Sequence, residues 1–173
     1  MSLVVRPLVP SDAPAFRRVR LEALETCPTA FAASHAEAAA RSLGDFEGWI
    51  RDAAPGAIFG AFDGRPMVGM AGLMVHRTAK ARHKGLLWGV YVQGEHLRRG
   101  VALALMEAVI AHARHHVVVL QAGVSSGNVA AQALYARLGF HRYGLEPKAL
   151  RVDGVFLDEE HLMLDFTDRR EGA

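Results

Sequence analysis

The sequence has almost no cysteine: Cys27 is the only one in 173 residues. A single cysteine cannot form a disulfide within the chain, so the fold must rest on its hydrophobic core. Long apolar runs are also missing, and no stretch approaches the roughly 20 residues that a membrane-spanning helix needs. The opening segment MSLVVRPLVP lacks the basic region and long apolar stretch of a signal peptide. We therefore expect a cytoplasmic protein with no membrane partner.

The chain carries little net charge, because its 20 Lys and Arg residues exceed its 18 Asp and Glu residues by only two, which gives a net charge of +2. This excess is too small to predict a nucleic-acid partner. The basic segment Arg77 to Lys84 has no interleaved aromatic residues, which favours a solvated connection. His112 and His116 are four residues apart, but no third metal ligand follows in a recognisable pattern. We expect neither a nucleic-acid partner nor a metal ion.

Linkers, internal repeats and low-complexity tracts are absent as well. A chain of this length fits one hydrophobic core. The 51% hydrophobic residues, with 22% charged residues spread among them, exclude the composition of a disordered chain. Residues 1–173 are therefore expected to form a single domain.

Capping residues and apolar periodicity predict the helices. Ser11 and Asp12 are suited to cap a helix, and Ser34 with Glu37 matches a capping box. Leu43 to Ala53 is expected to continue this second helical stretch irregularly. The other expected helices are Ala13 to Glu25, Gly100 to His115 and Asn128 to Leu138.

Apolar runs between turn residues predict the strands. Asp63-Gly64 and Asp153-Gly154 each favour a two-residue hairpin turn. Val117 to Val124 is a β-branched run between two helices, which indicates a buried, parallel, central strand. The pattern as a whole predicts an α/β fold with a mixed sheet. The other expected strands are Leu3 to Pro7, Ala57 to Phe62, Arg65 to His76, Leu86 to Val92, Phe140 to Leu145 and His161 to Phe166.

The junction before the helix at Gly100 has the features of an anion-binding site. The backbone N–H groups at a helix start are unpaired, the helix dipole is positive there, and glycine allows a ligand close to the main chain. Arg98 and Arg99 add positive charge at the same place. The segment contains neither G-x-G-x-x-G nor G-K-[ST], which excludes the dinucleotide and P-loop interpretations. A diphosphate from another ligand class fits best.

Two motifs resemble the GCN5-related N-acetyltransferase (GNAT) superfamily. Leu97 to Ala102 resembles the family motif [Q/R]-x-x-G-x-[G/A], matching it at Gly100 and Ala102 and departing from it at Leu97. Farther along, the family pattern N-x-x-A-x-x-[L/F]-Y-x-x-x-G-F is matched at Asn128, Ala131, Leu134, Tyr135, Gly139 and Phe140. The resemblance implies a single-domain mixed sheet, mostly antiparallel, with a splayed parallel central pair and flanking helices.

The resemblance also implies an acetyl-CoA-dependent N-acetyltransferase that moves an acetyl group to a primary amine by direct attack. Tyr135 is the expected general acid, because a phenol can protonate a comparably basic thiolate. The simpler alternative for Tyr135 is a core aromatic, and for Asn128 an ordinary helix N-cap. The residues expected to bind acetyl-CoA are Val90, Tyr91, Val92, Arg98, Arg99, Gly100, Val101, Ala102, Leu103, Asn128 and Ala131.

The acceptor side is less defined by the sequence. By resemblance, Phe31, Glu37 and Asp158 are expected to line the acceptor site. The general base stays open among Glu37, whose capping box explains it without catalysis, Asp158, Glu159, His161 and a water chain. The acceptor is a small-molecule or peptide amine, and a homodimer is left open. The competing hypothesis is a non-catalytic acyl-CoA-binding or interaction module, which the intact Tyr135 motif disfavours.

Overall fold

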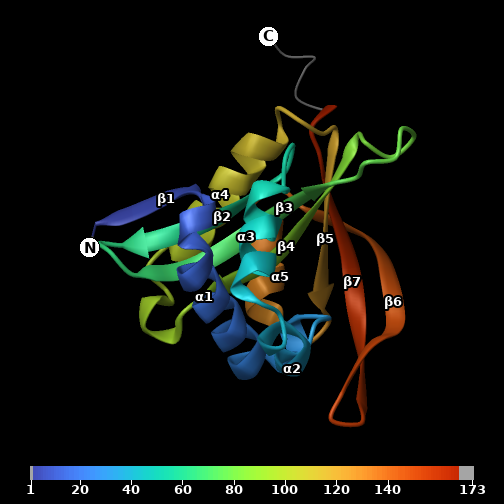
Figure 1. Cartoon of the computed structure of the whole chain (residues 1–173). Coiled ribbons are helices and arrows are strands. Elements are labelled where there is room, and N and C mark those ends of the chain that lie inside the picture. The colour runs from blue at the N-terminus through green and yellow to red at the C-terminus, as the bar shows by residue number, and fades with distance from the viewer. Residues whose placement is uncertain (1, 168–173) are drawn as a thin grey trace.

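The computed structural model describes residues 2–167 (Figure 1). Met1 and residues 168–173, which the expected single domain includes, lie outside the described residues. The strands are β1 Leu3–Pro7, β2 Ala57–Asp63, β3 Met67–Val75, β4 Lys84–Val92, β5 Val119–Ser125, β6 His141–Val152 and β7 Val155–Asp165. The α-helices are α1 Ala13–Thr26, α2 His35–Ala39, α3 Leu43–Arg51, α4 Val101–Ala113 and α5 Val129–Arg137, and 3-10 turns lie at Pro10–Asp12 (η1), Pro28–Ala30 (η2) and Gly94–His96 (η3).

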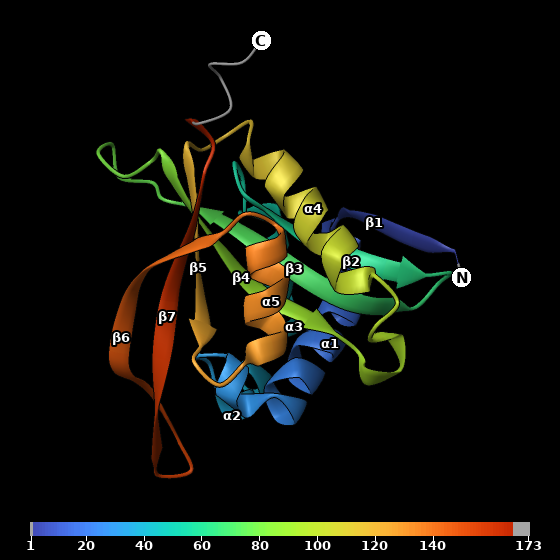
Figure 2. The same cartoon turned by 180° about the vertical axis from the view of Figure 1, so that it is seen from behind.

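All the strands belong to one sheet in the order β1-β2-β3-β4-β5-β7-β6. Neighbours pair antiparallel throughout, except for the parallel pair β4 and β5 near the centre. Helices α1 and α3 cover the face in front in Figure 1, and α4 and α5 cover the face in front in Figure 2. The fold class expected from the sequence is confirmed. The strand predicted at Val117 to Val124 is β5, Val119–Ser125, which is central and runs parallel to β4 but antiparallel to β7.

Each face of the sheet has its own hydrophobic core. The core under α4 includes Leu105, Val109 and Leu120. The core under α1 and α3 includes Phe16 and Phe46, whose rings pack edge to face with centroids 5.3 Å apart. Because β3 is covered on both faces, it is a nearly continuous apolar run without alternation. This burial holds the centre of the sheet rigidly in place.

Several local predictions were wrong in detail. The first hairpin is not a two-residue turn: Gly64 to Pro66 form the turn, because Pro66 has no N–H with which to begin the β3 ladder. The second turn, at Asp153 and Gly154, does have two residues, both with positive φ. The segment Leu43 to Ala53 does not continue α2 but forms the separate helix α3, which has its own capping box at Ser42 and Asp45.

The ends of other elements also differ from the prediction, and the strand expected at Phe140 to Leu145 runs from His141 to Val152 as β6. Asp12 stands at the N-terminus of α1 without capping it, because its carboxylate instead accepts hydrogen bonds from Arg6 at 2.7 and 2.9 Å. The last strand begins at Val155 and not at His161. Asp158, Glu159 and His161 therefore lie within β7, in a long hairpin with β6 at the edge of the sheet, and not before it.

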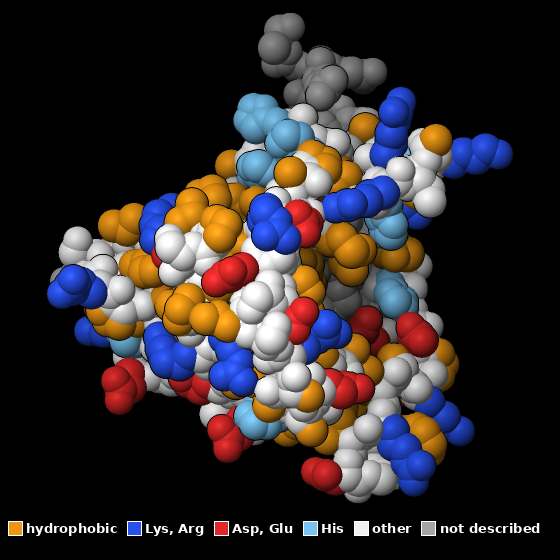
Figure 3. Space-filling view, viewed as in Figure 1, with side chains coloured by type: hydrophobic (Ala, Val, Ile, Leu, Met, Phe, Trp, Pro, Cys, Tyr) orange, Lys and Arg blue, Asp and Glu red, His pale blue; other side chains and the backbone are white. Residues whose placement is uncertain are grey.

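The surface in front in Figure 3 mixes basic, acidic and hydrophobic side chains, with histidines near the top. Within residues 2–167, no helix has the length and apolar character that crossing a membrane requires.

Candidate functional site

The two parallel strands at the centre of the sheet separate part of the way along. β4 pairs with β5 only from Lys84 to Leu87. Beyond Leu87 the backbone edge of β4 that faces β5 has no partner in the ladder, while β5 stays paired with β7. This separation opens the sheet between its two covered faces. Val90, Tyr91 and Val92, predicted to contact CoA, lie on this separated end of β4.

A β-bulge in β4 accompanies the separation. Met70 of β3 faces Tyr91 and Gly72 faces Trp88, so one residue of β3 lies opposite two residues of β4. Gly89 lies in the bulge with φ of 65°, a left-handed conformation that glycine adopts without steric penalty. The bulge lies in the part of β4 that has no partner on β5, beside the opening.

Residues of the second motif, Asn128, Ala131, Leu134 and Tyr135, line the small cavity in this opening, which has a volume of about 100 Å³. Asn128 caps α5, since its side-chain oxygen accepts a hydrogen bond from the N–H of Ala131 at 3.1 Å. The cap interpretation of Asn128 is thus confirmed, and the same residue also lines the cavity. The other lining residues that matter here are Phe31, Trp88, Gly89, Val90, Gly123, Ala131 and Tyr135.

Tyr135 enters the cavity from α5 and is 7% exposed. Its ring packs edge to face on Phe140, with centroids 5.2 Å apart. Burial, helped by the charge of Glu159, raises the pKa of Tyr135 to about 12. The hydroxyl therefore keeps its proton throughout the physiological pH range. Tyr135 is both a core aromatic and a proton-bearing group at the opening.

The loop before α4 has the backbone geometry of an anion site. Gly100 is the N-cap of α4 with φ of 79°, and Arg98 also has a positive φ, 59°. Within the part of the chain that the structure describes, no N–H from Arg98 to Leu103 donates a hydrogen bond to a protein acceptor. A cavity of about 280 Å³ lies against this loop, lined by Leu97, Arg98, Gly100, Val101, Ala102, Leu103, Leu134 and Arg137 among others.

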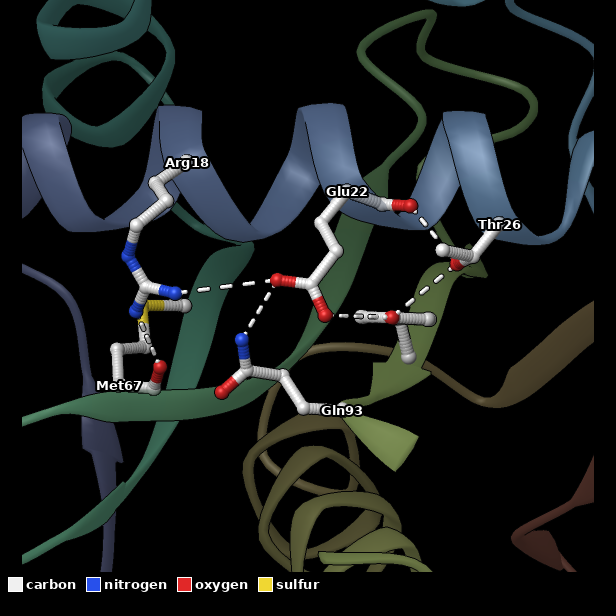
Figure 4. Close-up of polar contacts among 6 residues, drawn as sticks. Arg18, Glu22, Thr26, Met67 and Gln93 are labelled. Atoms are coloured by element: carbon white, nitrogen blue, oxygen red, sulfur yellow. Dashed lines mark hydrogen bonds and ion pairs between the residues drawn. The ribbon is translucent and has the colours of Figure 1, made fainter. Parts of the chain in front are cut away.

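A polar network fixes the end of β4 to α1 (Figure 4). One carboxylate oxygen of Glu22 accepts a hydrogen bond from the hydroxyl of Tyr91 at 3.0 Å, and the other accepts one from the amide of Gln93 at 2.6 Å. Arg18 donates to the carbonyl of Met67 at 2.6 Å and lies 3.9 Å from Glu22. Burial raises the pKa of Tyr91, so its hydroxyl stays a donor. The network holds the strand that leads into the loop before α4.

A larger cavity, of about 650 Å³, lies on the α1 and α3 face of the sheet. Its wall is mostly apolar, and Trp88 is shared with the small cavity in the opening. Arg20 of α1 lines it, and Asp45 and Asp52 contribute acidic groups. The remaining residues of the wall include Trp49, Ile58, Leu73, Val75 and Leu86.

Arg20 is a buried cation with no anionic partner among the residues that the structure describes. It is 8% exposed, and its Nη1 atom has no hydrogen-bond partner among residues 2–167. The guanidinium carbon lies 5.0 Å from the ring centre of Phe31 and 5.8 Å from that of Trp88. Burial lowers the pKa of Arg20, because the charged form loses hydration.

The three residues predicted for the acceptor site lie in different surroundings. Phe31 borders the opening and stacks on Arg20. Glu37 is exposed, and its carboxylate accepts hydrogen bonds from the N–H and hydroxyl of Ser34, which lowers the pKa of Glu37 and completes the predicted capping box. Asp158 is exposed and accepts a hydrogen bond from the N–H of Lys148 at 2.8 Å. Only Phe31 lines one of the cavities described above.

Among the alternatives for a general base, Glu159 is nearest to the opening. A Cβ added to Gly123, which lines the small cavity, would collide with the Glu159 carboxylate. Burial raises the pKa of Glu159, and the nearby His161 acts in the opposite direction. His161 itself lies 3.2 Å from Glu146, toward the edge strand β6. The opening thus has the protonated phenol of Tyr135 in its lining, and the Glu159 carboxylate, whose pKa is raised, lies behind Gly123.

Sequence reasoning missed Arg20 and Glu22. The signal for Arg20 was present, because it occupies a position on the apolar stripe of α1, four residues after Phe16 and next to Val19. A charged residue on a buried stripe needs a partner or a function. Glu22 gave no such signal, since its partners Tyr91 and Gln93 are about seventy residues away.

Comparison with known proteins gives a consistent result. The model of the acetyltransferase (GNAT) family matches residues 19–140. Comparison with curated proteins gives no significant match. Similar solved structures include yncA from Salmonella typhimurium with its cofactor acetyl-CoA, with a TM-score of 0.86, 20% identity and coverage of 98% of this chain and 97% of that one.

Two further solved structures are similar over almost their whole length. A GNAT-family acetyltransferase from Streptococcus pneumoniae has a TM-score of 0.84 and 21% identity, covering 95% of this chain and 99% of that one. A ribosomal-protein-alanine N-acetyltransferase from Brucella melitensis has a TM-score of 0.81 and 25% identity, covering 94% and 99%.

Proposed function

Because the chain belongs to the acetyltransferase (GNAT) family, we propose that it is an acetyl-CoA-dependent N-acetyltransferase that acetylates a primary amine by direct attack. The observation that carries the proposal is the opening between β4 and β5. The small cavity in this opening is lined by Tyr135, shares Leu134 with the cavity beside the loop before α4, and shares Trp88 with the large cavity on the α1 and α3 face. Two reactants entering from opposite faces of the sheet would meet there.

The diphosphate of CoA binds the loop before α4 in this proposal. The free N–H groups from Arg98 to Leu103 and the positive end of the α4 dipole are the donors, and Arg98 and Arg99 add charge. The pantetheine arm extends along the free edge of Val90 to Val92, beside Asn128 and Ala131. Open space around Gly100, where an added Cβ would meet nothing within 4 Å, supports close approach of a ligand.

The reaction joins the amine nitrogen to the acetyl carbonyl carbon while the bond from that carbon to sulfur breaks. The amine loses a proton, and the departing thiolate gains one. Main-chain N–H groups of the bulged β4 polarise the carbonyl oxygen. Tyr135 donates its proton to the thiolate. Its raised pKa ensures that the proton is present when the sulfur departs.

Glu159 is the general base that this geometry favours. Burial raises its pKa above that of an ordinary glutamate, which makes its carboxylate a stronger proton acceptor. The two groups are also coupled, because the charge of Glu159 contributes to the raised pKa of Tyr135. When Glu159 takes the amine proton, that contribution disappears and Tyr135 becomes a better acid. Uptake of the amine proton by Glu159 thus makes it easier for Tyr135 to donate its proton to the thiolate.

The experiment is to supply acetyl-CoA with a panel of primary amines and to measure CoA release together with the acetylated product. An acetyltransferase releases one CoA for each acetylated amine. A non-catalytic binding module would bind acetyl-CoA, measured by calorimetry, and release no CoA with any amine. That second outcome would reject the proposal.

A further inference from the structure

Arg20 lies in the wall of the large cavity without an anion of its own. A buried charge without a partner is strongly unfavourable, and arginine's planar fork is suited to a carboxylate. The ion pairs among the described residues join other side chains. We propose, resting on the function proposed above, that Arg20 binds a carboxylate of the acceptor and that the acceptor is a free amino acid or a close analogue.

The position of Arg20 limits how far that carboxylate lies from the reacting amine. A Cβ built on Gly89 would lie 3.8 Å from Nη1 of Arg20. Gly89 is the bulge residue that lines the opening together with Tyr135. An anion on Arg20 therefore lies beside the place where the thioester is attacked. Only a few bonds can separate the carboxylate from the amine, as in an α-amino acid.

The nearest acidic groups on the same cavity do not neutralise Arg20. Asp45 accepts hydrogen bonds from the N–H and hydroxyl of Ser42, at 2.7 and 2.9 Å. Asp52 is paired with Arg51 at 3.2 Å. Both carboxylates serve the ends of α3, so an anion from outside the protein is what Arg20 lacks.

The rest of the cavity indicates which side chain the acceptor carries. Its volume of about 650 Å³ exceeds what an amino acid needs, and apolar side chains form most of the wall. The rings of Phe31 and Trp88 lie beside the guanidinium, with centres 5.0 and 5.8 Å from its carbon. An acceptor with an apolar side chain would place that side chain against Trp49, Leu73 and Leu86. Peptide N-termini are disfavoured as acceptors, because the α-carboxyl group of their first residue is part of a peptide bond and carries no charge.

The test compares L-phenylalanine with L-phenylalaninamide, and L-leucine with L-leucinamide. The amides keep the size and apolar side chain, and they hold more of their amine in the neutral form near neutral pH. Without a carboxylate site the amides would therefore react faster. We expect the acids to have kcat/KM roughly 10- to 100-fold higher, the range for a hydrogen-bonded charged pair.

The substitution Arg20→Met should remove that preference by raising KM for the acid, with KM for acetyl-CoA unchanged. Arg17→Met is the matched control: it removes an arginine of the same helix whose Nη2 donates to the carbonyl of Ala39. It should keep the preference. If Arg20→Met does not fold, the comparison of acid with amide in the unchanged protein still tests whether the acceptor site binds a carboxylate.

Two results would overturn the inference while leaving the proposed function intact. One is acetylation of the amides at least as fast as the acids. The other is an equal loss for acid and amide in Arg20→Met. Absence of acetyl transfer to every amine would instead reject the proposed function itself, so the two failures are distinguishable.

Discussion

The proposed cofactor side and the proposed acceptor side of the opening are built differently. The cofactor side consists mainly of main-chain groups within two short segments, the loop at Gly100 and the start of α5. The acceptor side consists of side chains from distant parts of the chain: Arg20 from α1, Trp88 from β4 and Glu159 from β7. Main-chain sites bind a constant cofactor, whereas side chains from separate elements can change independently. This division fits a family in which one cofactor is combined with many acceptors.

The largest effect is expected from Gly100→Glu on the cofactor side. A side chain there enters the open space beside the free N–H groups, and its negative charge repels a diphosphate. Acetyl-CoA binding should be abolished by calorimetry while the fold remains. Gly154→Glu is the control, because Gly154 also has a positive φ and open space but lies in the β6 to β7 turn. Unchanged affinity in folded Gly100→Glu would remove the diphosphate assignment.

Tyr135→Phe tests the group between the two sides. If the hydroxyl protonates the thiolate, kcat should fall by roughly 10²–10⁴-fold with nearly unchanged acetyl-CoA affinity. Tyr143→Phe is the control, since Tyr143 is exposed and accepts a hydrogen bond from Gln121. Tyr135→Ala should lower stability by about 3–5 kcal/mol in thermal melting, because it leaves a cavity. A fully active Tyr135→Phe would reduce Tyr135 to a packing residue.

Glu159→Gln tests the acceptor side. A general base contributes typically 10²–10⁴-fold, and a water chain would replace part of that, so we expect kcat to fall about 100-fold. In the unchanged protein, activity should fall with decreasing pH as Glu159 takes up a proton, at a higher pH than for an ordinary glutamate because burial raises its pKa. In Glu159→Gln, this decrease of activity at low pH should disappear from the pH profile. The control is Glu160→Gln, because Glu160 is the adjacent residue and is paired with Arg142. This variant should keep the decrease of activity at low pH. An unaltered profile in Glu159→Gln would point to another base.

Arg20→Met should stabilise the protein although it impairs acceptor binding. Replacing a buried, unpaired charge by an apolar side chain of similar length removes a desolvation penalty, partly offset by the lost contacts with Phe31 and Trp88. We expect a net gain of about 1 kcal/mol, which corresponds to a rise of roughly 2–4 °C in Tm. A lower Tm would show that Arg20 is held by interactions that stabilise the fold.

The smallest effect is expected from Glu37→Gln. Glutamine can complete the capping box with Ser34 as glutamate does, so α2 should remain intact. If Glu37 only caps the helix, kcat and KM for the amine should stay within about twofold, because the capping geometry is preserved. A tenfold or larger decrease in kcat/KM for the amine would support the prediction from the sequence that Glu37 lines the acceptor site.

The sequence by itself determined the features that rest on neighbouring residues. The cap at Asn128, the capping box at Ser34, the left-handed glycine before α4 and the central strand β5 all follow from short-range patterns. The two motifs of the resemblance have the same local character. A helix start or a tight turn is fixed by a few consecutive dihedral angles, which consecutive residues encode.

The tertiary structure alone decided which side chains meet at the opening. Whether Asp158 or Glu159 approaches it depends on the length of β7 and the register of β7 against β5, and Glu159 lies opposite Ser125. A shift of one residue would turn Glu159 to the other face of the sheet. Arg20 likewise became a candidate only when α1 packed beside Trp88 and Phe31. Such contacts join residues far apart in the chain, and their geometry comes from the packing of the whole sheet.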